Sequence, residues 1–173
     1  MFLYILACLV ILLGCGMLGV VFSGKFKERV SQLSQLQNVM TQLEFDIDFL
    51  NITLDESFER ISRNVESPLK SVLLYVSDRL KKNPVADMQR LWSRAITKYQ
   101  YDLALSKEDI DILIDFSKTL GEGNREKEKN NIKLAERRLK MALDRARSEA
   151  DKNVKMYRGL GFLAGVFIVI VLL

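Results

Sequence analysis

The feature that most constrains this chain is its last fifty residues, 124–173, in which a highly charged segment passes into an apolar tail. They contain no proline, so no residue in them forces a helix to end. In the charged half, apolar or small side chains recur at alternating three- and four-residue steps: Ile132, Ala135, Leu139, Ala142, Ala146, Ala150, Val154 and Tyr157. This spacing predicts one long helix with a narrow apolar face.

Both ends of the chain are apolar. Residues 1–24 carry no charged side chain and are long enough to cross a bilayer as a helix. Residues 159–173 are also uncharged but would rise only about 22 Å against a hydrocarbon core of ~30 Å. The sequence therefore predicts a transmembrane helix over 1–24 and a membrane segment over 159–173 that spans marginally. A cleaved signal peptide is the alternative for 1–24, although the basic start is missing; Cys15 is a weak match to a lipoprotein processing site.

Basic residues flank both apolar segments. Lys25, Lys27 and Arg29 follow the first segment, and Lys152, Lys155 and Arg158 precede the second. The positive-inside rule then predicts that residues 25–158 form a cytoplasmic domain. Along this domain basic and acidic residues alternate, as on a solvated helical surface, and the net charge of the chain is only +4.

The middle of the chain is predicted to form helices with short turns. A three-four apolar spacing runs on from the first segment through Phe26, Val30, Leu33, Met40, Leu43, Ile47 and Leu50. Helix starts are indicated by a capping box at Thr53 and Glu56, by Ser67 before Pro68, and by Ser106 with Asp109.

A break at Lys82–Pro84 precedes a helix in which Trp92 is interpreted as a core residue. No stretch alternates with a period of two, so no sheet is expected. The predicted fold is all-α: an antiparallel bundle of about six helices, in which the first and last helices are long and continue into the membrane segments.

Residues for catalysis or for a metal site are missing from the sequence. It has no His, and its two cysteines, Cys8 and Cys15, would lie about 10 Å apart on a helix. Phosphate-loop, GxSxG and HExxH motifs are absent. Three acidic pairs are two residues apart and are predicted to point apart on solvated surface: Asp46 with Asp48, Asp109 with Asp111, and Glu126 with Glu128. We therefore expect no enzymatic activity, no cofactor and no metal.

Two segments carry a resemblance to a known family. One is the turn LGEGNREKEKNNI, residues 120–132, and the other is the membrane entry with Lys155, Met156, Tyr157, Leu160, Gly161, Leu163 and Gly165. With the uncharged first helix, they make the whole chain resemble the stage III sporulation protein AB family of endospore-forming bacteria. That family often has Ser-Asp and then Gln in the turn, where this chain has Gly123, Asn124 and Glu128.

The resemblance implies a role in the mother cell-to-forespore channel formed during engulfment, in the outer forespore membrane. The family's helical domain is similar to the cytoplasmic domains of inner-membrane platform proteins of type II secretion and type IV pili. Such platforms couple a cytoplasmic secretion ATPase, here a stage III sporulation protein AA-like protein, to the other channel components. The oligomeric state is left open, with a homo-oligomer as one alternative.

The turn before the last helix is the candidate surface for a partner. It comprises Leu120, Gly121, Gly123, Asn124 and Glu128. The glycines allow positive φ, Asn124 can cap the helix, and Glu128 is expected on an exposed face. A plain helix-turn-helix corner is the alternative interpretation of the same residues.

Two other classes of function are alternatives to the platform. A nucleic-acid tether would rest on the basic stretch Lys133–Arg147, but no aromatic residue lies between Arg125 and Met156 on which a base could stack. No nucleic-acid partner is therefore expected. A membrane-tethered scaffold or signalling protein would share the long helices, although the chain has no room for an input or output domain.

Overall fold

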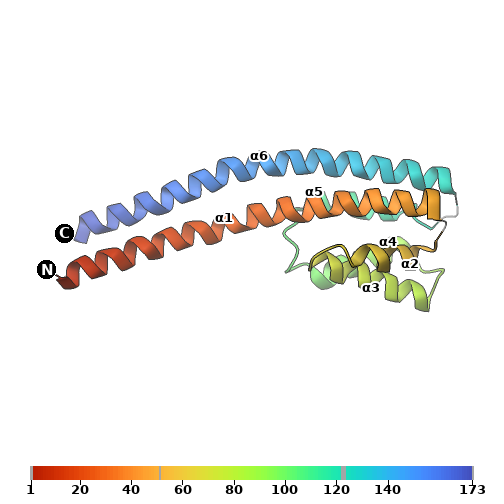
Figure 1. The fold of residues 1–173 in the computed structure, drawn as a ribbon, viewed down its shortest axis with the longest axis horizontal. Coiled ribbons are helices and arrows are strands. Elements are labelled where there is room, and N and C mark those ends of the chain that lie inside the picture. Colours follow the sequence, from red (N-terminus) through yellow and green to blue (C-terminus); the bar gives the residue numbers. More distant parts are fainter. Residues whose placement is uncertain (1, 51, 122–123, 173) are drawn as a thin grey trace. The chain divides into compact units, whose positions relative to one another are not determined.

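The computed structural model describes residues 2–50, 52–121 and 124–172, with side chains for 24–50, 52–121, 124–154 and 156. Over these residues it contains helices and no strand, so the all-α prediction is confirmed. The elements are α1 (Phe2–Phe45), the π-helix η1 (Asp46–Leu50), α2 (Leu54–Ser62), α3 (Leu69–Lys82), α4 (Met88–Tyr99), α5 (Lys107–Ser117) and α6 (Arg125–Leu172). Figure 1 shows their order along the chain.

The chain divides into two compact units, and α1 and α6 each contribute to both. The terminal unit comprises Met1–Val30 and Arg145–Leu173, and the bundle unit comprises Ser31–Asp144. In the terminal unit Arg29 Nη1 donates to Glu149 Oε2 at 2.9 Å, which joins the two helices. Among residues with described side chains, no helix is long and apolar enough to cross a membrane. The predicted segments 1–24 and 159–173 lie almost wholly outside that part and stay predictions.

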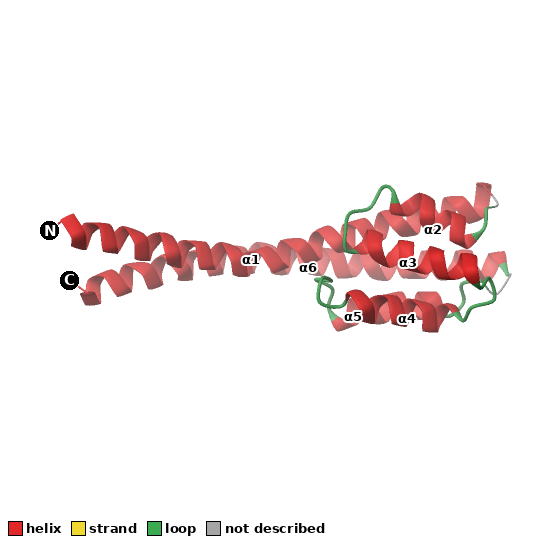
Figure 2. Ribbon diagram, turned by 90° about the horizontal axis from the view of Figure 1, so that it is seen from below, coloured by secondary structure: helices red, strands yellow, loops and turns green. Residues whose placement is uncertain are grey.

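In the bundle unit the end of α1 lies beside the start of α6, and α2 to α5 pack against them (Figures 1 and 2). Thr41 of α1 donates its hydroxyl hydrogen to Glu136 of α6 at 3.0 Å. The predicted apolar face of α6 is confirmed for Ile132, Ala135 and Leu139, all fully buried. The predicted apolar face included Ala142 and not Leu143. In the structure Leu143 is buried and Ala142 is only half-buried.

The centre of the bundle is aromatic. Trp92 is 1 % exposed, and its ring meets Phe58 edge-on at 5.7 Å and Phe116 edge-on at 6.0 Å between centroids. Such edge-to-face pairs add stabilisation beyond the apolar area that they bury. The prediction that Trp92 is a core residue is confirmed, and its ring joins α2, α4 and α5.

Helix starts were predicted with mixed success. The capping box at Ser106 and Asp109 is present, with both reciprocal hydrogen bonds formed. The capping box predicted at Thr53 is not formed. Thr53 is the N-cap of α2, but its side chain makes no capping hydrogen bond. Pro68 occupies the N-cap of α3 and not its first helical position. Asp87, which the sequence reasoning missed, caps α4 by accepting from Arg90 N at 3.1 Å.

The π-helix η1 breaks the predicted apolar spacing at the end of α1. A π-helix places more residues in each turn than an α-helix, so side chains beyond it rotate relative to the preceding face. Ile47 remains buried at 8 % exposure, but Leu50, predicted to continue the apolar face, is 44 % exposed. That part of the prediction was wrong because the spacing assumed an uninterrupted α-helix.

The acidic pairs point apart as predicted, but the expectation that all six residues are solvated was wrong. One member of each pair is buried, namely Asp46, Asp109 and Glu128. A buried carboxylate must be hydrogen-bonded or paired to be tolerated, and each has such a partner. Arg60 Nε donates to Asp46 at 3.2 Å, Ser106 N to Asp109 at 2.8 Å, and Gly121 N to Glu128 at 2.8 Å. These carboxylates therefore fix segments of the bundle in place.

Candidate partner-binding site at the loop end of the bundle

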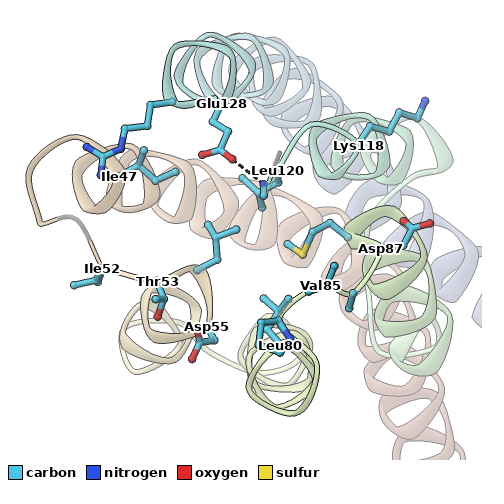
Figure 3. A pocket seen from close by; sticks show the side chains of 16 residues that line it. Ile47, Ile52, Thr53, Asp55, Leu80, Val85, Asp87, Lys118, Leu120 and Glu128 are labelled. Carbon is cyan, nitrogen blue, oxygen red and sulfur yellow. Dashed lines mark hydrogen bonds between the residues drawn. The ribbon is translucent and has the colours of Figure 1, made fainter. Parts of the chain in front are cut away.

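An open pocket of about 700 Å³ lies at the end of the bundle unit where three helices start and three end. We call it the loop-end pocket, and Figure 3 shows its walls. Its lining comes from η1, from the start of α2 and the two residues before it, from the last turn of α3, from the loop before α4 and the first residue of α4, from the turn after α5, and from the first turn of α6. The residues are Ile47, Ile52, Thr53, Leu54, Asp55, Leu80, Pro84, Val85, Ala86, Asp87, Met88, Lys118, Leu120, Gly121, Arg125 and Glu128.

The predicted turn forms one wall of this pocket. Leu120 is 3 % exposed, and Gly121 has a φ of +85°, a conformation that the sequence analysis said glycine allows here. Asn124 caps α6, because its Oδ1 accepts from Lys127 N at 3.1 Å. Gly123 lies outside the described residues. The structure thus brings Leu120, Gly121 and Glu128 together at the pocket.

The placement of Glu128 corrects the sequence analysis. It was expected on an exposed face, but it is only 8 % exposed and its Oε1 accepts from the Gly121 backbone N–H at 2.8 Å. Figure 3 shows this bond reaching from α6 to the turn. The carboxylate therefore closes the turn by satisfying a backbone donor, and a side chain used in this way has little surface left to offer a partner.

Replacing Gly121 by valine is expected to destabilise the bundle by about 1–3 kcal/mol. The positive φ of Gly121 is unfavourable for a β-branched residue. Space is not the obstacle, since an added Cβ would meet Leu54 Cδ1 at 3.6 Å and Met88 Cγ at 3.7 Å, ordinary contact distances. Urea unfolding followed by fluorescence of the single tryptophan measures the loss. Gly121→Asn is the control, because asparagine tolerates positive φ better; an equal loss in both variants would contradict strain as the cause.

Three apolar side chains on η1 and in the loop before α4 are exposed, and sequence reasoning missed them. Phe49 and Leu50 of η1 are 74 % and 44 % exposed, and Val85 in the loop before α4 is 91 % exposed. Of these three, Val85 lines the pocket, as does Ile47 of η1 on its other side (Figure 3). The signal for Val85 was its position after Pro84 in a predicted break, where no helical face could bury it.

Charged side chains around the pocket are partly paired. Lys129 of α6 forms an ion pair with Asp48 of η1. The hydrogen bond within this pair is the main reason that the pKa of Lys129 is raised. Lys118 pairs with Asp115 at 2.7 Å. Within the part of the chain that the structure describes, Asp55, Glu56 and Glu126 form no ion pair. Asp55 and Glu56 nevertheless interact electrostatically with Lys81, and Glu126 with Lys129.

The geometry of the described residues offers an open pocket lined by apolar and charged side chains. Among residues with described side chains, no cluster of three or more His, Cys, Asp or Glu side chains is suited to a metal ion. The buried carboxylates Asp46, Asp109 and Glu128 are each engaged by the protein itself. The expectation that the chain is not an enzyme stays a prediction.

The basic residues predicted to flank the membrane segments are placed in part. Lys25, Lys27 and Lys152 are exposed, whereas Arg29 is engaged with Glu149. The side chains of Lys155 and Arg158 lie outside the described residues. The exposed lysines remain suited to anionic lipid headgroups.

Together, these features define an all-α bundle protein in which four short helices lie between long first and last helices in the sequence, and a pocket opens at the loop end. The chain belongs to the stage III sporulation protein AB family, whose family model matches residues 4–173.

Two individual similarities agree with this assignment. The chain is 29 % identical over 148 residues to the stage III sporulation protein AB of Bacillus subtilis (strain 168), covering 86 % of each chain. It is also similar to a solved structure of a stage III sporulation protein AB, with a TM-score of 0.66 and 26 % identity. That similarity covers 72 % of this chain and 97 % of the solved one. The protein is thus a sporulation protein.

Proposed function

We propose that this sporulation protein is a membrane-anchored, non-catalytic platform of the mother cell-to-forespore channel and that it couples the channel to a cytoplasmic secretion ATPase. The observation that carries the proposal is the loop-end pocket, with the exposed Val85 in its lining, in a chain that matches the family along 4–173. The sequence also lacks a phosphate loop, which suits a protein that depends on a separate ATPase.

The anchoring part of the proposal comes from the two uncharged ends and their basic flanks. In this arrangement residues 25–158 face the mother-cell cytoplasm, and both ends insert in the outer forespore membrane. Protease added to intact protoplasts is therefore expected to leave the bundle uncut, and lysis should make it accessible. Digestion from outside, or a mature chain that begins at Cys15, would contradict this topology.

The coupling part is tested by co-purification of the full chain, in detergent, with the stage III sporulation protein AA-like ATPase of the same organism. We expect the ATPase to be retained by the wild-type protein and lost when Val85 is changed to glutamate, because a charge at the pocket rim would oppose apolar contact. Tyr101→Glu is the matched control, since Tyr101 is equally exposed at 93 % but follows the far end of α4. If neither the wild-type protein nor the Tyr101→Glu control retains the ATPase, a helical scaffold unrelated to secretion is the better assignment.

A further inference from the structure

We propose that the outer face of α3 and α4 binds an acidic segment of a partner protein, in which carboxylates recur about once per helical turn. This inference goes beyond the proposed function, because it assigns a second surface whose partner is recognised by charge. It does not depend on what meets the loop-end pocket.

The net charge of the chain is concentrated in residues 69–102, which form α3, the loop before α4, α4 and the three residues after it. This stretch has seven basic and three acidic residues, whereas the rest of the chain has 19 of each, so its net charge equals the +4 of the whole chain. No acidic residue lies between Met88 and Tyr101. A surface with such an imbalance attracts partners of the opposite charge.

Three of the basic residues form one row on α4. Arg90, Arg94 and Lys98 recur every four residues, and all three are exposed. The opposite face of the helix is buried in the core, where Trp92 and Ala95 are 1 % and 0 % exposed. At a rise of ~1.5 Å per residue, neighbours in the row are about 6 Å apart and the row spans about 12 Å.

The ring of Tyr75 on α3 joins this row to the neighbouring helix. Lys98 Nζ lies 4.9 Å from the ring centroid, and Arg79 Cζ of α3 lies 5.3 Å from it, both within range of a cation–π interaction. Because α3 and α4 are in contact (Figure 2), Tyr75 positions cations from two helices on one surface. We call Tyr75, Arg79, Arg90, Arg94 and Lys98 the basic hairpin face.

Carboxylates of the protein neutralise only part of the charge on and around this face. The ion pairs are Lys81 with Glu59, Lys82 with Asp78, and Arg90 with Asp87, and Lys81 also interacts with Asp55 and Glu56. Arg94 and Lys98 form no ion pair with any described residue, and Arg79 has only a Coulomb interaction with Asp78. Asp102 is the one acidic residue of 69–102 outside these pairs, and it lies beyond the end of α4. Three cations are therefore left for a partner.

The number and spacing of these cations favour protein carboxylates over phosphates. Proteins that bind duplex DNA tightly make about 6–10 phosphate contacts, and clusters that bind anionic lipid have about 4–8 basic residues. The basic hairpin face offers three unpaired cations over about 12 Å. A helix with Asp or Glu at every fourth position repeats at the same ~6 Å, and a guanidinium such as that of Arg94 can bind a carboxylate through two parallel hydrogen bonds. An acidic protein helix therefore matches this face.

The direct test is photocrosslinking in sporulating cells that produce the full chain. Benzoylphenylalanine replaces Ser93 in one strain, Thr97 in a second and Asn130 of α6 in a control strain, and all three positions are exposed. Mass spectrometry then identifies the crosslinked peptide. We expect Ser93 and Thr97 to crosslink a protein segment with Asp or Glu at three- or four-residue steps. A segment without such residues, a nucleic-acid or lipid adduct, or a yield no higher than that from Asn130 would overturn the proposal.

Charge reversal supplies a second readout at exposed positions. The double variant Arg94→Glu with Lys98→Glu is expected to lower the crosslinking yield from Ser93 by at least about fivefold, because it places like charges opposite the partner. Arg137→Glu with Lys140→Glu is the matched control, since it reverses two exposed cations of α6 that also form no ion pair with a described residue. It should leave the yield unchanged. Equal losses in both double variants would assign the effect to net charge alone and overturn the proposal.

Circular dichroism of both double variants, purified as full chains in detergent, checks that the helices are retained. The outcome is independent of the co-purification test of the proposed function. If the chain retains the ATPase while Ser93 and Thr97 give no acidic adduct, the platform assignment stands and the basic hairpin face has no such partner. If no ATPase is retained and the acidic adduct forms, the assignment of this face stands without the platform.

Discussion

Replacing Trp92 by alanine is expected to lower the free energy of unfolding of the bundle by about 3–5 kcal/mol. The side chain is 1 % exposed and contacts Phe58 of α2 and Phe116 of α5, so its removal leaves a cavity where three helices meet. Because small domains are stable by only about 5–15 kcal/mol, this change alone approaches complete loss of the fold. Urea unfolding of the full chain in detergent, followed by circular dichroism, measures the effect.

Trp92→Phe is the matched control for this change. Phenylalanine keeps an aromatic ring between Phe58 and Phe116 and removes an indole N–H that has no hydrogen-bond partner among the described residues. We expect it to cost about 1–2 kcal/mol, well below the alanine variant. Similar losses for the two variants would show that the ring contacts do not govern the stability of the bundle.

Replacing Glu128 by lysine is expected to cost about 2–4 kcal/mol of stability. The exchange removes the acceptor of the Gly121 N–H bond at 2.8 Å and places a cation at a site that is 8 % exposed. The Gly121 N–H loses its protein partner, and an unpaired charge at the buried Glu128 position adds the larger cost. If Glu128 were exposed, as the sequence analysis expected, the same exchange would change the stability very little.

The fluorescence of Trp92 reports this unfolding, because it is the single tryptophan and lies in the bundle core. Glu126→Lys is the control, since it makes the same charge reversal two residues earlier at an exposed position. It should change stability by no more than about 0.5–1 kcal/mol. A Glu128→Lys protein as stable as the Glu126→Lys protein would refute the role of the carboxylate in closing the turn.

Much of the fold follows from periodicity and from local helix signals. The buried positions Ile132, Ala135 and Leu139 repeat at a helical spacing that tertiary contacts do not alter. The Ser106 and Asp109 capping box is a local pair, so four residues of sequence contain everything that forms it. The positive φ at Gly121 follows from the same local logic.

The buried acids are where the sequence could not predict the outcome. Asp46 is buried because Arg60, fourteen residues away, reaches it after the chain turns back. Glu128 is buried because the turn presents the Gly121 N–H to it. Periodicity assigns charged residues to the surface unless a partner from another element is known. The π-helix at Asp46–Leu50 was missed for a related reason, since no local pattern distinguished its rotation from an α-helix.

The hydrogen bond between Thr41 and Glu136 joins residues that are 95 apart in a chain of 173. Contacts of such large sequence separation must overcome the entropy of closing a long loop, and they slow folding. The contacts among α2, α3, α4 and α5 are local and can form early, whereas the side of the core made by α1 and α6 waits for nearly the whole chain to be synthesised. Until α6 leaves the ribosome, the part of the core to which Ile132, Ala135 and Leu139 belong is missing. A nascent chain of this topology therefore depends on the speed of translation, and on chaperones, more than a bundle with neighbouring first and last helices would.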